Sequence, residues 1–88
     1  MTDEFTPRDL GLLTGHAWAK NALPIDVTTA AEEGVVPDET WDTIMATGMR
    51  ERLDEFDDPA ADEAFLAGFY HGVRAFIVED LRRLSNLN

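Results

Sequence analysis

Residues 64–76 read AFLAGFYHGVRAF, and this stretch decides the fold because it places two glycines four residues apart in an otherwise helical pattern. Glycine weakens a helix interior, so Gly68 and Gly72 need a structural reason. Residues four apart share a helix face, and small residues at that spacing let a second helix come near. Gly11 and Gly15 repeat the spacing. We therefore expect these two glycine pairs to pack against each other, in one chain or between two copies.

Helix start and stop signals predict four helical segments and no strand, at residues 7–22, 29–34, 38–56 and 59–84. Thr6 followed by Pro7, and Asp58 followed by Pro59, are favourable N-cap and first-turn pairs. Thr29 has the spacing of a capping box with Glu32, and Gly34 suits a left-handed stop, although the order of this short segment stays open.

The predicted fold class is all-α, a small helical bundle of three long helices plus one short helix. Because the connection between the third and fourth helices is short, we expect these two to form an antiparallel hairpin. The chain is short enough for a single helical domain over residues 1–88, with frayed ends at 1–5 and 85–88.

The long helices differ in how much of their surface is apolar. The third is an ordinary amphipathic helix, except that Arg52 falls in its apolar sector, where it either reaches past the last turn to solvent or binds a buried anion. The first helix is apolar nearly all round, apart from a narrow strip with His16 and Lys20. Such a helix is either the centre of a compact bundle or part of a contact with a second subunit.

Excess apolar surface on the first and fourth helices is the main indication of function. A small protein that exposes a large apolar patch normally covers it with a partner or a ligand, and a two-fold homodimer is the simplest arrangement. The alternative, in which the four helices bury everything within one chain, stays open. The residues expected at the interface are Gly11, Gly15, Trp18, Phe65, Gly68, Phe69, Gly72 and Phe76.

The charge of the chain restricts its partners. Asp and Glu number 18 against 7 Lys and Arg, which gives a net charge of −11, and Lys20 is the single lysine. Repulsion therefore disfavours direct nucleic-acid binding and anionic membrane surfaces. This acid-rich, lysine-poor composition resembles that of halophile proteins. The alternative is an acidic decoy or inhibitor that mimics nucleic acid and binds a basic nucleic-acid-binding partner.

Chemistry-bearing motifs are sparse. There is no cysteine, no phosphate-binding loop and no H-E-x-x-H motif, and neither His16 nor His71 has a histidine or carboxylate three or four residues away. We predict no catalytic residue, no cofactor and no metal ligand, and therefore no enzyme. The six carboxylates of residues 54–63 lack the pattern of a calcium loop and fit an acidic turn between helices.

The aromatic sector of the fourth helix gives a third alternative for the function, in which the protein binds a small apolar ligand. The segment MTDEF is acidic and leads into no long apolar run, so we expect no secretory signal or membrane span and a cytoplasmic protein. The sequence predicts a protein–protein interaction or regulatory module.

Overall fold

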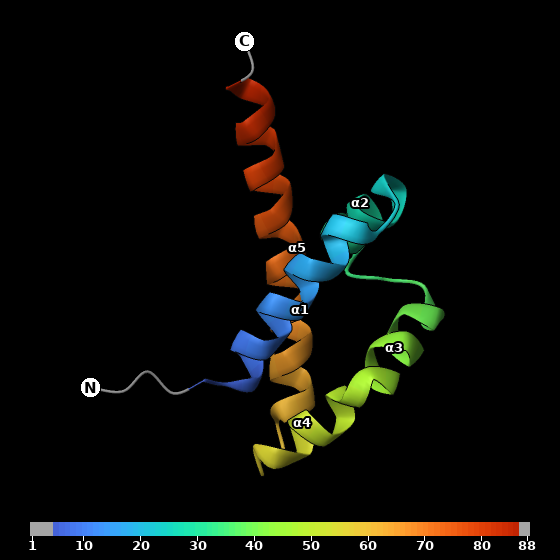
Figure 1. The fold of residues 1–88 in the computed structure, drawn as a ribbon, viewed down its shortest axis with the longest axis vertical. Helices are drawn as coiled ribbons and strands as arrows, with labels where there is room; N and C mark the ends of the chain where they lie inside the picture. The colour runs from blue at the N-terminus through green and yellow to red at the C-terminus, as the bar shows by residue number, and fades with distance from the viewer. Residues whose placement is uncertain (1–4, 87–88) are drawn as a thin grey trace, which may run out of the picture.

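The computed structural model describes residues 5–86, and within that range the protein is all-α with no strand (Figure 1). The elements in chain order are α1 (Pro7–Asn21), α2 (Pro24–Glu33), α3 (Asp38–Ile44), the widened turn η1 (Met45–Met49), α4 (Arg50–Glu55) and α5 (Ala61–Ser85). The all-α prediction is confirmed. The predicted frayed residues 1–4 and 87–88 lie outside the described range, whereas Ser85 is still helical and the ring of Phe5 stacks on Phe56.

The start of α1 is fixed by the predicted residues. Thr6 is the N-cap, and its hydroxyl accepts a hydrogen bond from the Asp9 amide at 3.1 Å. The Asp9 carboxylate in turn accepts from the Thr6 amide at 3.0 Å, which completes a capping box. Pro7 occupies the first helical position, where no amide donor is needed.

The second helix begins earlier than predicted. Pro24 starts α2, so the predicted capping box at Thr29 is wrong. The hydroxyl of Thr28 donates to the carbonyl of Pro24, and that of Thr29 donates to the carbonyl of Ile25 at 2.8 Å, as interior helical threonines do. The predicted stop is confirmed, because Gly34 has a left-handed φ of 67°.

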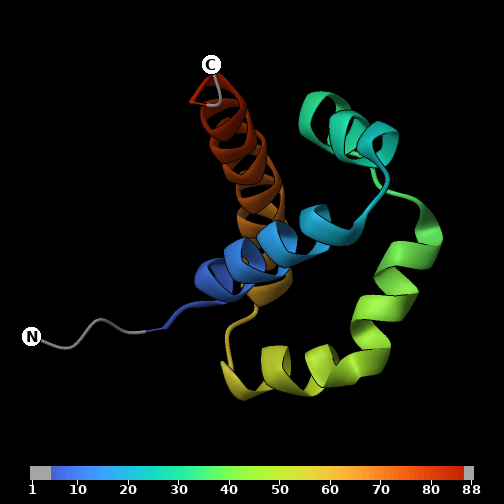
Figure 2. The same cartoon turned by 45° about the horizontal axis from the view of Figure 1, so that its top comes forward.

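The third predicted helix is bent at Gly48, which has φ 90° and ψ 7°. A residue with a Cβ adopts this conformation only with strain, so the glycine allows α3 and α4 to take different directions. The antiparallel hairpin is not confirmed: α4 packs against the start of α5, while α3 turns away from it (Figure 2). Arg52, beyond the bend, is exposed, which agrees with a side chain that reaches solvent.

The connection into α5 also differs from the prediction. Asp58 does not cap the helix directly, because α5 begins at Ala61 with Ala60 at the N-cap position. The Asp58 carboxylate instead accepts from the Ala60 amide at 2.9 Å and closes a turn before the helix. Asp57, one residue earlier, has a positive φ of 50°. The predicted N-cap was therefore placed two residues too early.

The centre of the molecule is the crossing of α1 over α5, two helices far apart in sequence that lie side by side in both views (Figures 1 and 2). Phe65, Phe69 and Val73 of α5 are almost completely buried beside this crossing. The buried apolar residues form one connected cluster that also draws on α2, α3, η1 and α4, comprising Leu10, Ala19, Val27, Ala30, Val36, Ile44, Met49, Leu53, Phe65, Phe69 and Val73.

Candidate interaction surfaces

The four glycines of the predicted interface meet at the α1–α5 crossing of a single chain. Gly11 and Gly15 lie against the backbone of Phe65 and Phe69, and Gly68 and Gly72 lie against the backbone of α1. A Cβ at any of the four positions would come within 3.0 Å of main-chain atoms of the other helix, a separation that real Cβ atoms essentially never show. The two backbones therefore touch. Of the two arrangements that the sequence leaves open, the glycine pairs here meet within one chain.

The aromatic members of the predicted interface surround the same crossing. Phe65 and Phe69 are 1% and 0% exposed, so in this conformation they offer no area to a second chain. Trp18 is half-buried, with its ring centroid 5.5 Å from that of Phe69, and Phe76 is half-buried against the ring of His16. Six of the eight residues are thus covered within the chain, and Trp18 and Phe76 keep some exposed area.

A tertiary pair that sequence spacing missed lies beside the crossing. His16 Nε2 of α1 is 2.7 Å from Glu79 Oε2 of α5. The two residues are 63 positions apart, so no local motif could reveal them. The pair joins the helices on the surface beyond the glycines, whereas His71 is exposed, as its place on the polar side predicts. Among residues 5–86, no group of three or more His, Asp or Glu side chains could hold a metal ion.

The last turns of α5 extend beyond the crossing (Figure 1). They carry exposed apolar side chains. Val78, Leu81 and Leu84 are 48%, 59% and 50% exposed. Leu81 also borders a hollow of about 350 Å³ between the end of α1, α2 and α5, whose apolar lining includes Val27 and Ile77. We refer to Ile77, Val78, Leu81 and Leu84 together as the α5 end surface.

A second apolar hollow opens where the Gly48 bend separates α3 from α5. Its volume is about 250 Å³, and it is lined by Trp41, Met45, Arg50, Leu53, Asp62, Phe65 and Leu66. We call it the bend groove. It adjoins a polar hollow of about 410 Å³ with which it shares Arg50, Leu53 and Asp62, and which is further lined by Asp54, Asp57, Asp58, Pro59 and Ala61.

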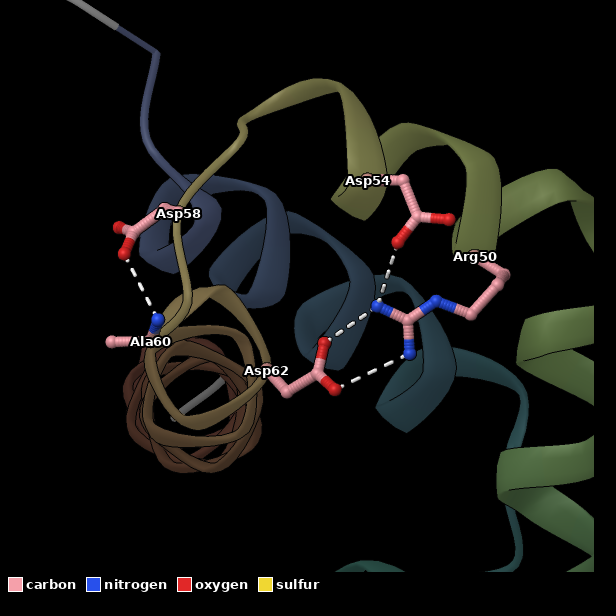
Figure 3. Close-up of polar contacts among 5 residues, drawn as sticks. All are labelled: Arg50, Asp54, Asp58, Ala60 and Asp62. Atoms are coloured by element: carbon pink, nitrogen blue, oxygen red, sulfur yellow. Dashed lines mark hydrogen bonds and ion pairs between the residues drawn. The ribbon is translucent and has the colours of Figure 1, made fainter.

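Arg50 joins α4 to the first turn of α5 (Figure 3) and lines both of these hollows. Its guanidinium donates two hydrogen bonds to the Asp62 carboxylate, at 2.7 and 3.3 Å, and lies 3.3 Å from Asp54. The hydrogen bond from Arg50 lowers the pKa of Asp62, and the same bond raises the pKa of Arg50. The acidic stretch 54–63 is therefore a turn whose carboxylates are partly neutralised by one arginine.

Within the described part of the chain, none of the helices has the length and apolar character that crossing a membrane demands. Comparison of the chain with protein-family models, with curated proteins and with solved structures gives no match.

Proposed function

We propose that the protein is a small acidic protein–protein interaction module that forms a homodimer through the α5 end surface. The observation that carries the proposal is the exposure of Val78, Leu81 and Leu84 on the part of α5 that α1 leaves uncovered. Their spacing of three residues keeps them on one side of the helix. Exposed apolar side chains gathered in this way mark a contact surface, and a second copy is the simplest partner.

The charge around this surface supports self-association. Lys20 and Arg82 line hollows that also include Leu81, and Arg83 lines a neighbouring hollow, where it pairs with Asp80 at 2.6 Å. Three of the seven basic residues thus lie at this end of a chain with a net charge of −11. They reduce the repulsion between two acidic copies at this surface. The remaining repulsion is screened by salt, so the dimer should be tighter at high ionic strength.

Leu81 should contribute most to the contact. Full burial of a leucine side chain stabilises by about 1.5–3 kcal/mol, so covering the exposed part of Leu81 is worth about 1–2 kcal/mol. A two-fold interface contains the residue twice, which makes about 2–4 kcal/mol. Leu81→Glu should therefore weaken the dimer roughly 30- to 1,000-fold.

Light scattering at high and low salt tests the proposal. The wild-type protein should have a mass near twice 9.8 kDa at high salt, and Leu81→Glu should be a monomer. Leu13→Glu is the matched control, because Leu13 is 58% exposed on α1 and borders none of the hollows beside Leu81. A monomeric wild type at high salt would remove the dimer, and a dimeric Leu81→Glu would place the interface elsewhere.

The acidic surface itself is better explained by salt adaptation than by nucleic-acid mimicry. A mimic needs carboxylates arrayed on one face, whereas Asp and Glu occur on each helix, for example Asp9 on α1, Asp26 on α2 and Asp38 on α3. We also propose a cytoplasmic, non-enzymatic role. The hollow at His16 and Glu79 is lined by Lys20, Phe76, Asp80 and Arg83, without a hydroxyl or thiol that the histidine could activate.

A further inference from the structure

We propose that the bend groove binds a basic segment of a partner protein, with one large apolar side chain of that segment seated in the groove. This inference goes beyond the proposed dimer. The groove lies at the first turns of α5, whereas the α5 end surface lies at its last turns. The two proposals can therefore fail separately.

The groove is a built feature of the fold. The positive φ of Gly48 turns α3 away from α5, which leaves Trp41 and Met45 on one wall and Phe65 and Leu66 on the other. The Trp41 wall is held in place, because its ring centroid lies 4.8 Å from that of Phe69. Leu66 is 40% exposed, so an apolar occupant would remove leucine surface from water.

The size of the groove favours a side chain over a complete small molecule. Sites for small molecules have volumes of roughly 300–1,000 Å³. The bend groove has about 250 Å³ and shares Arg50, Leu53 and Asp62 with the polar hollow beside it. A single aromatic or branched side chain, held by a peptide that continues outside, fits this shape, and such buried anchors dominate the energy of many interfaces.

Charge complementarity identifies the flanking residues of the occupant. The adjoining hollow presents the carboxylates of Asp54, Asp57, Asp58 and Asp62 against the one guanidinium of Arg50. Arg50 is already engaged by Asp62 and Asp54, so Asp57 and Asp58 keep most of their negative potential. Lysine or arginine next to the anchor would meet these carboxylates, and the net charge of −11 would steer such a segment towards the protein.

Three probe peptides test the proposal by calorimetric titration at low salt: KKFKK, KKAKK without the apolar anchor, and EEFEE with the charge reversed. KKFKK should bind, KKAKK should bind at least about 10-fold more weakly, and EEFEE should show no binding. The affinity for KKFKK should fall as salt is added. Equal binding of KKAKK and KKFKK, or no binding of KKFKK, would overturn the proposal.

Variants of the full chain locate the site. Leu66→Lys places a cation in the groove and should lower the affinity for KKFKK at least about 10-fold. Leu13→Lys is the control, because Leu13 is also an exposed leucine, on α1, and this variant should bind KKFKK as tightly as wild type. Asp57→Asn should weaken KKFKK several-fold and flatten its salt dependence. If Leu66→Lys binds KKFKK as tightly as wild type, the basic-segment assignment is wrong. It is also wrong if toluene, an apolar ligand without charge, binds by itself and Asp57→Asn leaves the affinity for KKFKK unchanged. None of these results depends on the mass measured by light scattering.

Discussion

Gly68→Ala is the sharpest test of the α1–α5 crossing. The added Cβ would overlap the main-chain carbonyl oxygen of Arg8. It would also lie 2.9 Å from the carbonyl carbon of Arg8 and 3.0 Å from the amide nitrogen of Leu12, where ordinary contact begins at 3.4 Å. These are main-chain atoms of a helix and cannot rotate aside, so the helices must separate by about 0.5 Å or more. A gap of that size forfeits roughly a quarter to a half of the dispersion energy of each affected contact.

The expected cost follows from two opposing effects. Alanine stabilises a helix by about 1 kcal/mol relative to glycine, while overpacking of a tight site costs about 1–3 kcal/mol and occasionally more. Because the obstruction is backbone and the displaced helix also packs on Phe65 and Phe69, we expect the upper part of that range, a net loss of about 1–2 kcal/mol. A chain of 88 residues has a total stability of roughly 4–13 kcal/mol, so this loss is easily measured.

Urea unfolding followed by circular dichroism gives the free energy of unfolding for each variant. Ala67→Leu is the control, because Ala67 is the neighbouring residue of α5 and is exposed, so a larger side chain there should change stability by less than about 0.5 kcal/mol. If Gly68→Ala were about 1 kcal/mol more stable than wild type, helix propensity alone would explain it. The two backbones would then not be in contact.

Three further outcomes follow from the structure. Gly48→Ala should lose about 1–2 kcal/mol in the same unfolding assay, because alanine is strained at φ 90°, and a variant at least as stable as wild type would show that the bend is absent. Asp62→Asn should be less stable than wild type at pH 7. Since Arg50 lowers the folded-state pKa of Asp62 below its ordinary 3.8, this difference should vanish as the pH falls through that lowered value; a difference that persists in acid would contradict the pairing. Thr6→Ala should cost about 1 kcal/mol by thermal unfolding through loss of the N-cap, and an unchanged midpoint would argue against the capping box.

Helix starts and stops could be predicted from the sequence where they depend on a residue and its immediate neighbours. Thr6 and Pro7 start α1, and Gly34 ends α2, because capping and left-handed stops depend on the few adjacent residues. The start of α2 was missed because Pro24 suits both the end of one helix and the first turn of the next. At Asp58 the same ambiguity moved the helix start by two residues.

The directions in which the helices run relative to one another could not be predicted from the sequence. Gly48 fits the apolar periodicity of one continuous helix, and nothing local specifies that it takes φ 90° and turns α3 away. The bend groove exists only because of that turn, so Trp41 and Leu66 could not be placed opposite each other beforehand. The pair of His16 and Glu79 likewise depends on the way α1 crosses α5. The glycine spacing predicted close approach of the helices and left open which chain supplies the partner.

The α1–α5 crossing also sets an order of events when the protein is synthesised. Gly11 meets the backbone of Phe65, so the two contacting segments leave the ribosome about 55 residues apart. At 5–20 residues per second, α1 waits roughly 3–10 s for its neighbour. A 15-residue helix is marginally stable alone, so during this interval α1 remains largely unfolded with its apolar residues exposed. These helices should therefore pack together only after α5 has left the ribosome, and more slowly than bundles whose closest helices are adjacent in sequence.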